Sequence, residues 1–553
     1  MMLYMRRVFA IILAFTMAAS ALGQDIDSII GGMSRREKIA QIIIVAVDTQ
    51  DKPERRASHE EAVRQGLGGV IVMDDVLAPC MEMLNQYQAD AKIPLLVSID
   101  GEWGASMRFY EYASFPKAMQ MGALPSEDLV YQAGKAVGEE LSQIKIFADY
   151  APDVDINNNP NNPVIGVRSF GEDREKVATY GSAFMRGMKD AGVAGSAKHF
   201  PGHGDTDVDS HKGLPVLTFD RKRLDSLELY PFRRLIADGV EMVMVGHLSV
   251  PALDPSGTPA SISEPIITGL LRKEMGFDGI IITDALQMKG LTNDFGDASV
   301  AAYKAGVDIL LMPQDALKTI DNLDALFADG TLDEAGLDAR VRKMLEFKAS
   351  RGMLAAGYNR YVDPSEAVRS SLRPETEALI QKISDESMTV VKGAENLPLK
   401  AGRTAYVAIN AATQQSEEFF LELCKQYFPA DRFRLDGDFG QAEVDALREK
   451  LEGYDQVVIG FHSGEPVRRS GGPRRESLIS PEQFAAVSAL AKELKNVTGV
   501  MFANPYRLID LQGWKDFSIF IVAYSDTAFN NRAAARAIIK GSAKGKLPVS
   551  IEN

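Results

Sequence analysis

The chain has 553 residues, more than one hydrophobic core usually organises, so we expect at least two large domains. Hydrophobic residues make up 46% and charged residues 25% of the chain, as in an ordinary soluble globular protein. The formal net charge of −15 argues against nucleic acid or an anionic membrane as a partner, because both require a basic surface.

Residues 1–23 have the pattern of a signal peptide. Arg6 and Arg7 precede the apolar run VFAIILAFTMAA, and the small residues Ala21 and Gly23 offer a cleavage site. The apolar run is shorter than the ~20 residues that a membrane-spanning helix needs, which favours cleavage over a permanent anchor. We therefore predict an exported protein, periplasmic or secreted, with no stable membrane insertion.

Eight short apolar runs alternate with amphipathic helical stretches in the first part of the chain. Most runs are apolar throughout, which is typical of strands covered on both faces. The runs are residues 39–47, 68–74, 94–100, 149–157, 194–200, 242–250, 279–285 and 306–312. Helical patterns separate most of them, for example at 127–144 and 173–192. Eight β-then-α units predict an α/β fold, a (β/α)8 barrel of the TIM type, with an open doubly wound sheet as the alternative.

A second α/β alternation follows the barrel pattern. Its strand-like runs, separated by helical segments, are residues 404–410, 454–463, 496–504 and 518–526. This pattern predicts a smaller α/β sandwich domain with a mostly parallel sheet. The predicted division of the chain is a signal peptide at 1–23, a catalytic barrel at 24–355, a linker at 356–380 and the sandwich domain at 381–553.

Polar residues stand at or just past the carboxyl ends of six predicted barrel strands. In a (β/α)8 barrel these ends share one face, where the active site belongs. We therefore expect an active site built from side chains at these strand ends. The residues are Asp74, Asp100, Asp155, Lys198 with His199, His247 and Asp284.

Three of the six histidines lie in the stretch KHFPGHGDTDVDSH, residues 198–211. Its alternating aspartates begin like a calcium loop, but Ser210 and Val216 stand where that loop needs Gly and Glu. His199 and His203 are four residues apart, but Pro and Gly between them exclude a helical zinc motif. A metal site is thus the least favoured of three explanations, beside a polar turn and a catalytic loop.

The catalytic explanation uses Asp209 and His211. Two residues apart on an extended loop, both side chains can point the same way, so the carboxylate can bond one imidazole nitrogen. The other nitrogen can then donate and later accept a proton near neutral pH. By itself an Asp-x-His pair is also compatible with a polar surface turn.

Together with GIIITDALQMKG at 279–290, this stretch resembles glycoside hydrolase family 3, in its β-N-acetylhexosaminidase branch. The resemblance covers the barrel pattern, about residues 34–350. It implies a retaining exo-β-N-acetylglucosaminidase that needs neither metal nor organic cofactor. It further implies that Asp284 is the nucleophile and that His211 is the general acid/base, with Asp209 as its partner.

The resemblance also implies that five residues bind the sugar: Asp100, Arg108, Arg168, Lys198 and His199. The family usually has Asp-Gln-Glu-Gly-Gly-Arg where this chain has DGEWGA, beginning at Asp100. Trp103 in this segment either stacks on a sugar or packs in the protein. Together with the export signal, the resemblance implies a cell-wall glycan with terminal N-acetylglucosamine as the substrate.

Two other enzymes of the same family are alternatives: a β-glucosidase or β-xylosidase, and an N-acetylglucosamine phosphorylase. A glycan-binding module without catalysis is a further alternative, against which the intact Asp284 and His211 argue. Among the remaining histidines, His247 either lines the pocket or satisfies a core hydrogen bond. We expect His59 and His462 at the surface.

Overall fold

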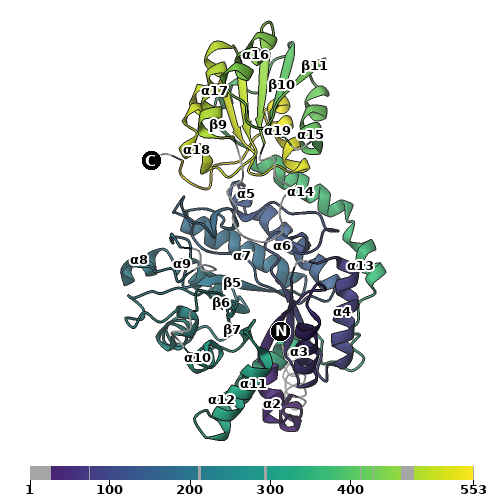
Figure 1. Ribbon diagram of the computed structural model, residues 1–553, viewed down its shortest axis with the longest axis vertical. Helices are drawn as coiled ribbons and strands as arrows, with labels where there is room; N and C mark the ends of the chain where they lie inside the picture. The colour runs from purple at the N-terminus through teal and green to yellow at the C-terminus, as the bar shows by residue number, and fades with distance from the viewer. Residues whose placement is uncertain are drawn as a thin grey trace, which may run out of the picture.

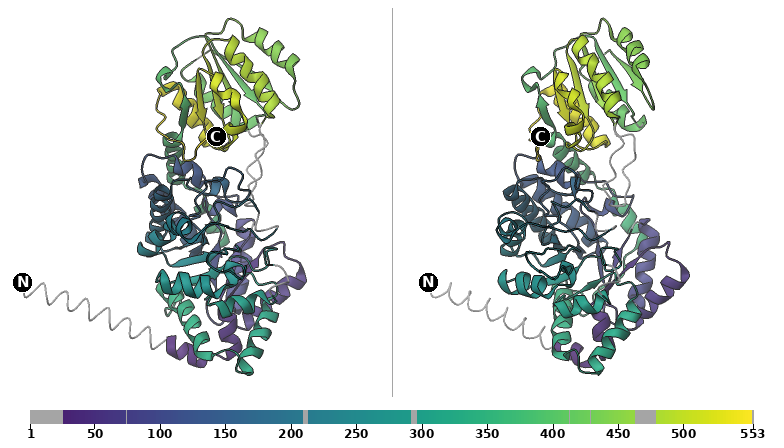
Figure 2. Two further views of the ribbon diagram at one scale, coloured as in Figure 1. Left: turned by 90° about the vertical axis from the view of Figure 1, so that its left-hand side faces the viewer. Right: turned by 60° about the vertical axis from the view of Figure 1, so that its left-hand side comes forward.

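A computed structural model describes residues 26–73, 75–208, 213–291, 296–411, 413–427, 429–462 and 479–551. Four predicted features lie outside these ranges: the signal peptide at 1–23, Asp74, Asp209 and His211. The chain forms two bodies stacked along its long axis, a barrel below and a sandwich above (Figure 1). Two further views show the same stacking (Figure 2).

The lower body is an eight-stranded parallel sheet with the spatial order β7-β6-β5-β4-β3-β2-β1-β8. A parallel bridge between Ile282 and Ile309 joins the two ends of this sheet, so it forms a barrel. This confirms the predicted barrel and excludes the open doubly wound sheet. The strands are β1 (Ile43–Val47), β2 (Gly69–Val72), β3 (Leu96–Ile99), β4 (Ala148–Asp149), β5 (Ala194–Phe200), β6 (Met242–Val245), β7 (Ile280–Thr283) and β8 (Leu310–Leu311).

Helices cover the outside of the barrel. The helix predicted at 173–192 begins after Asp173, whose side chain accepts a hydrogen bond from the Lys176 amide. Among the described residues, no helix is both long enough and apolar enough to cross a bilayer. The main helices are α2 (Arg35–Gln41), α3 (Pro53–Arg64), α4 (Leu77–Asp90), α5 (Ala118–Gly122), α6 (Asp128–Gln143), α7 (Arg174–Asp190), α8 (Arg221–Ser226), α9 (Tyr230–Ala237), the π-helix η4 (Pro265–Glu274), α10 (Ala298–Ala305), α11 (Ala316–Ala328) and α12 (Glu334–Ser350).

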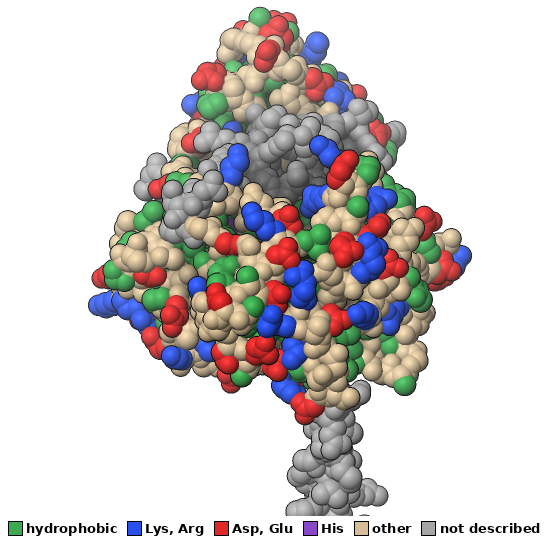
Figure 3. Space-filling view, turned by 60° about the horizontal axis from the view of Figure 1, so that its bottom comes forward, with side chains coloured by type: hydrophobic (Ala, Val, Ile, Leu, Met, Phe, Trp, Pro, Cys, Tyr) green, Lys and Arg blue, Asp and Glu red, His purple; other side chains and the backbone are tan. Residues whose placement is uncertain are grey.

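Opposite charges are interspersed on the outside of the barrel. Figure 3 shows acidic and basic side chains mixed over one face of the molecule. Some of them form ion pairs that tie α2 to α11 and α12, such as Arg35 with Asp324 at 2.6 Å and Lys38 with Asp338 at 2.7 Å. The predicted absence of a nucleic-acid partner stays a prediction.

Helix α12 closes the N-terminal end of the barrel. Its Met344 and Phe347 belong to the same buried cluster as inward-facing strand residues such as Ile44. Beside them Lys348 is fully buried, and its Nζ donates to Oε1 of Gln41 at 2.5 Å. Burial lowers the pKa of Lys348 to about 7, because the surrounding apolar groups disfavour the charged form.

The upper body is a six-stranded sheet with the order β11-β10-β12-β13-β14-β9, in which only β9 runs antiparallel to its neighbour. This confirms the predicted sandwich with a mostly parallel sheet. Separate hydrophobic clusters lie on its two faces. Its elements are β9 (Thr389–Lys392), β10 (Thr404–Ile409), α15 (Thr413–Cys424), β11 (Ala430–Leu435), α16 (Gln441–Leu451), β12 (Gln456–Phe461), α17 (Pro481–Glu493), β13 (Val497–Met501), α18 (Arg507–Asp510), β14 (Ile519–Val522) and α19 (Ala528–Lys540).

Two helices connect the bodies, α13 (Pro364–Ser371) and α14 (Pro374–Ser387). Helix α13 contacts α4 of the barrel, whereas α14 contacts α6 of the barrel and α19 of the sandwich. The connection therefore lies against both bodies. We propose the predicted limits, 24–355 and 381–553, for the two domains.

Two histidines that we expected at the surface are buried. His462 follows β12, where its Nε2 lies 2.7 Å from the Tyr406 hydroxyl and its Nδ1 lies 3.1 Å from Oδ1 of Asp526. His59 is buried in α3, with its Nδ1 3.7 Å from Asp51. The expectation was wrong for His462 because its partners lie far away in the sequence, and for His59 because it lies on the buried face of α3.

Replacing Lys348 by methionine, which has similar length and no charge, should stabilise the protein. The unfolded lysine keeps its proton up to about pH 10, whereas the native one releases it near pH 7, so wild-type stability rises with pH across this window. We expect Lys348→Met to gain about 1–3 kcal/mol at pH 6 and progressively less towards pH 9. Melting temperatures at both pH values test this, with exposed Lys318→Met as the control; a gain independent of pH would contradict it.

Candidate active site

The carboxyl ends of the barrel strands bring the predicted site residues to one face. The Asp284 amide donates to the Val245 carbonyl, and the Gly246 amide donates to the Phe200 carbonyl, both at 2.9 Å. These bonds place Asp284 near the level at which β5 ends. The other described site residues come from the end of β3 (Asp100), the loop after β3 (Arg108), the loop after β4 (Arg168) and β5 itself (Lys198, His199).

Lys198 lies at the centre of the site, between two carboxylates. Its Nζ is 2.9 Å from Oδ1 of Asp100 and 2.7 Å from Oε1 of Glu102. Burial alone would lower the pKa of Lys198, but the two carboxylates raise it above its ordinary value. The ammonium group therefore stays charged and holds the loop after β3 against β5.

Asp100 is the member of this group that reaches solvent. Its side chain is 23% exposed, against 2% for Lys198 and 7% for Arg108. Arg108 donates to Oδ2 of Asp100 at 3.0 Å. Burial opposes ionisation of Asp100, but Lys198 and Arg108 lower its pKa below the usual value. Asp100 is thus a fixed anion that can accept hydrogen bonds from hydroxyl groups.

Arg168 holds the other side of Glu102 with a forked contact. Its Nε lies 2.9 Å from Oε2, and one terminal nitrogen lies 2.7 Å from Oε1. Burial acts against the charged form of Glu102, yet Arg168 and Lys198 together hold its pKa well below the usual range. The same guanidinium lies 3.3 Å from Nε2 of His199, so it joins the carboxylate group to the histidine.

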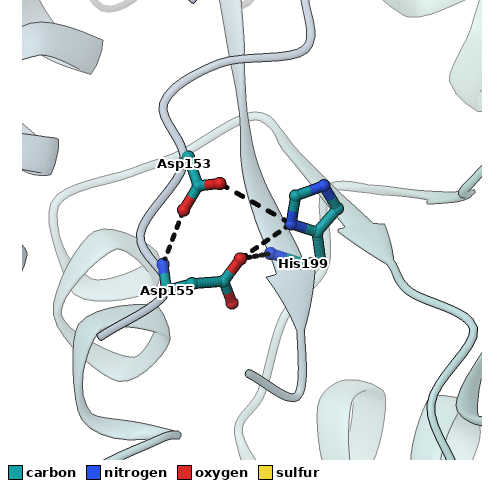
Figure 4. A group of neighbouring side chains, drawn as sticks. All are labelled: Asp153, Asp155 and His199. Carbon is teal, nitrogen blue, oxygen red and sulfur yellow. Dashed lines mark hydrogen bonds and ion pairs between the residues drawn. The ribbon is translucent and has the colours of Figure 1, made fainter. Parts of the chain in front are cut away.

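The His199 side chain contacts two aspartates from the loop after β4 (Figure 4). Its Nδ1 lies 2.7 Å from Oδ2 of Asp155 and 3.8 Å from Oδ2 of Asp153. Burial and the neighbouring Asp155 raise the pKa of Asp153 well above its ordinary value. Burial also opposes ionisation of Asp155, but His199 lowers its pKa. Asp155 is therefore the carboxylate that orients the imidazole, and the raised pKa of Asp153 favours its protonated form.

Asp153, Asp155 and His199 are also the one group in the described ranges that could hold a metal ion, with ligand atoms within 4.8 Å of one another. The Arg168 guanidinium already lies 3.6 Å from Oδ2 of Asp153 and beside His199. A divalent ion would have to compete with this fixed cation. The observed contacts explain the three residues as a hydrogen-bonded support for the site, and the absence of a metal stays a prediction.

The predicted pair Asp209 and His211 lies outside the described residues, but the start of their loop is described. The His203 amide donates to Oδ1 of Asp155 at 2.6 Å. Burial lowers the pKa of His203 to about 4, so this imidazole is neutral at physiological pH. The loop therefore begins on the same aspartate that orients His199.

Asn162 holds the loop at Gly204, where the close approach of the backbone requires glycine. The Asn162 side-chain amide donates to the carbonyls of His203 and Gly204, both at 2.9 Å. A Cβ atom at Gly204 would lie 1.8 Å from the carbonyl oxygen of Ile156, so no other residue fits there without a shift. The loop is thus fixed against the one that carries Arg168.

Asp284 is half-buried after β7, and its Oδ1 accepts a hydrogen bond from the Ala285 amide at 2.7 Å. His247 is fully buried, with Nε2 2.9 Å from the Ala285 carbonyl and Nδ1 2.7 Å from Oγ of Ser261. Of the two roles left open by the sequence, these contacts favour the core hydrogen bond. His247 supports the backbone beside Asp284.

Asp149 explains a departure from the family pattern. It lies at the end of β4, and its Oδ1 accepts a hydrogen bond from the Gly101 amide at 2.8 Å. A Cβ atom at Gly101 would lie 3.0 Å from Oδ2 of Asp149, so the carboxyl group occupies the space that a larger residue would need. Burial raises the pKa of Asp149 to about 7.

Trp103, in the same segment, is buried within the barrel's hydrophobic cluster. Lys117 lies over its ring, with Nζ 5.2 Å from the ring centre. Packing, not sugar stacking, is therefore its observed role. The structure also adds Glu102, Asp149 and Asp153 to the site, for which the sequence analysis assigned no role.

Comparison with known proteins agrees with this geometry. The sequence matches the family model described as glycosyl hydrolase family 3, N-terminal domain, over residues 34–347. The chain belongs to glycosyl hydrolase family 3. This confirms the predicted family, so the protein is a glycoside hydrolase and its substrate is a carbohydrate.

Similar proteins in the family extend over both domains. Beta-hexosaminidase A from Pseudoalteromonas piscicida is 30% identical, with 89% of this chain and 90% of that protein covered. A beta-N-acetylglucosaminidase/beta-glucosidase from Cellulomonas fimi is 29% identical, with 87% of each chain covered. Among solved structures, a family 3 beta-N-acetylglucosaminidase from Paenibacillus sp. str. FPU-7 has a TM-score of 0.77 and 29% identity, covering 94% of this chain and 99% of that one.

Replacing Asp149 by asparagine should change how stability depends on pH. The native carboxyl keeps its proton up to about pH 7, whereas the unfolded one loses it near pH 4, so this group costs stability as pH rises between these values. Asparagine can still accept the Gly101 hydrogen bond but does not ionise. We expect Asp149→Asn to gain on the order of 2 kcal/mol relative to wild type between pH 5 and pH 8.

The measurement is denaturant unfolding of both proteins at these two pH values. Asp445→Asn, at an exposed position in the sandwich domain, is the control for a surface carboxylate. A stability difference between Asp149→Asn and wild type that stays constant over this range would show that Asp149 does not titrate there.

Proposed function

We propose that the protein is a retaining exo-β-N-acetylglucosaminidase that removes terminal N-acetylglucosamine from cell-wall fragments or related glycans. The observation that carries this proposal is the position of Asp100, a partly exposed anion held by Lys198 and Arg108, at the strand ends that also carry Asp284. The names of the relatives from Pseudoalteromonas and Paenibacillus support the choice of an N-acetylated sugar.

Sugar binding in this proposal uses the paired charges of the site. Asp100 accepts hydrogen bonds from two sugar hydroxyls, and Lys198, His199, Arg108 and Arg168 complete the pocket. The carboxylates of Asp100 and Glu102 lie against the cations Lys198, Arg108 and Arg168. Mixed charges of this kind suit a neutral sugar, because a large net charge would favour charged ligands instead.

In the first chemical step the Asp284 carboxylate attacks the anomeric carbon, and the bond from that carbon to the leaving oxygen breaks. His211 gives its proton to that oxygen, and Asp209 stabilises the imidazolium and fixes its tautomer. A covalent glycosyl ester on Asp284 results. The described start of this loop is anchored on Asp155 and Asn162 through His203, which supports a role for the loop at this face of the barrel.

In the second step neutral His211 takes a proton from water, and the hydroxide attacks the anomeric carbon from the side that the leaving group occupied. The ester bond to Asp284 breaks, and its carboxylate is restored. Two inversions give a product with the β configuration of the substrate.

The sharpest test compares two chromogenic substrates on the same enzyme. We expect kcat/KM for p-nitrophenyl N-acetyl-β-glucosaminide to exceed that for the β-glucoside by at least about tenfold, since the site is proposed to select the acetamido group. The comparison matters because the Cellulomonas relative is named for both activities. A preference for the glucoside would overturn the proposed substrate.

Variants and product analysis complete this test. Asp284→Ala and His211→Ala should each lower kcat by roughly a hundredfold or more. Asp278→Ala, an exposed carboxylate just before the same strand, is the matched control and should keep wild-type kcat. NMR of the first product should show the β anomer; the α anomer would exclude retention, and a sugar 1-phosphate formed in phosphate buffer would identify a phosphorylase.

We further propose that the protein is exported and that residues 1–23 are removed. Arg6, Arg7 and the apolar run support this. Expression of the full chain in a bacterial host should place activity in the periplasm or medium, and N-terminal sequencing should begin at Gln24. Active protein in the cytoplasm that retains the first 23 residues would contradict the proposal.

A further inference from the structure

The sandwich domain directly contacts the loop that carries Arg168. We call residues 156–172 the arginine loop; it connects β4 to α7 and contains the short helix η2 (Gly166–Arg168). The Tyr506 hydroxyl, from the sandwich domain, donates to the Asn157 carbonyl at 2.7 Å, and this bond is buried. Val167, next to Arg168, packs against the hydrophobic cluster of the sandwich domain.

The C-terminal segment, at Pro548 and Ser550, forms hydrogen bonds with the other end of the same loop. The Glu172 amide donates to the Pro548 carbonyl at 3.0 Å. The Ser550 amide and hydroxyl donate to the Glu172 carboxylate at 2.9 and 2.5 Å. At Gly171, which has φ +135°, a Cβ atom would lie 2.4 Å from the Pro548 carbonyl, so the approach is too close for any other residue.

Hydrogen bonds within the arginine loop join its two ends. The Asn157 amide donates to the Gly171 carbonyl at 2.9 Å. The Asn157 side chain donates to the Gly166 carbonyl at 3.0 Å, immediately before Val167 and Arg168. Asn157 therefore links the Tyr506 contact to the helix that presents the guanidinium.

Helix α5 extends the same interface in the barrel. Its Gln120 and Asn530 of α19 exchange two side-chain hydrogen bonds, at 2.8 and 3.0 Å. Met119 also belongs to the hydrophobic cluster of the sandwich domain. Helix α5 contacts η2, and Figure 1 shows it directly below the sandwich. The loop and its neighbouring helix are thus both attached to the second domain.

We propose that the sandwich domain positions Arg168 for sugar binding, with Tyr506 as the positioning residue. The fork between Arg168 and Glu102 has contacts of 2.7 to 3.1 Å, a geometry that a small displacement of the loop would break. Tyr506 acts on it through the Asn157 carbonyl. This inference rests on the proposed function, because Arg168 is taken to contact the substrate.

The test is the Tyr506→Phe variant of the full chain, assayed with p-nitrophenyl N-acetyl-β-glucosaminide. It removes one hydroxyl and keeps the ring in the core. A looser Arg168 weakens binding of substrate and transition state alike, so we expect KM to rise by roughly three- to tenfold with kcat within about twofold of wild type. An unchanged KM would overturn the proposal.

Tyr427→Phe is the matched control. The Tyr427 hydroxyl donates to the Leu399 carbonyl at 2.7 Å, the same kind of bond, but both residues lie within the sandwich domain. This variant should lose comparable thermal stability and keep the wild-type KM. An equal rise of KM in both variants would show that Tyr506 acts through general stability alone.

Two further variants separate the inference from the proposed function. In an Arg168→Lys background, Tyr506→Phe should change KM by less than about twofold, because the forked contact is already lost. If Arg168→Lys alone leaves KM unchanged, the binding role of Arg168 is wrong. If it raises KM while Tyr506→Phe does not, only the coupling is wrong.

Val167→Ala tests the same coupling by a second contact, and we expect its KM to rise as well, even if Tyr506→Phe folds poorly.

Discussion

The active-site face depends on one buried ammonium group, that of Lys198. A charge so deep in the protein is tolerated only when opposite charges meet it, and Asp100 and Glu102 do so at 2.9 and 2.7 Å. Each carboxylate then needs a further cation, which brings in Arg108 for Asp100 and Arg168 for Glu102. Satisfying one charge therefore fixes the loops after β3 and β4 against β5, and it leaves Asp100 as the member of this group that reaches solvent.

The barrel could be predicted because its strands are covered on both faces and are apolar throughout. The run at 194–200 became β5 with the same limits, whereas β4 covers only Ala148–Asp149 and overlaps the predicted run at 149–157 by one residue. Beyond Asp149 the chain continues beside β5 without regular pairing, and a single bridge from Asp153 to Lys198 helps to place Asp153 and Asp155 beside His199. Strands β9 and β11 gave no comparable signal, because both lie at sheet edges and β11 mixes charged with apolar residues.

The site could be predicted only in part, and the limit is physical. A signature in sequence identifies residues close together in the chain, such as Lys198 and His199, but an ion pair depends on residues that the fold brings together. Glu102 meets Arg168 across 66 positions, and Asp149 meets the Gly101 amide across 48. His462 shows the same limit, since its partners Tyr406 and Asp526 are 56 and 64 residues away. No local pattern marks such contacts.

The second domain reaches the site through backbone groups and through the side chains of Val167 and Glu172. The Asn157 carbonyl accepts a hydrogen bond from Tyr506, and the Glu172 amide donates a hydrogen bond to the Pro548 carbonyl. These contacts fix where the loop lies, and none of them uses the Arg168 guanidinium itself. When interdomain contacts hold the loop, the residues that meet the sugar can change while the loop keeps its place. The rigidity of the site is then independent of the choice of substrate. The charge network around Lys198 sets the chemistry of the pocket, and the interface sets the distance at which Arg168 joins it.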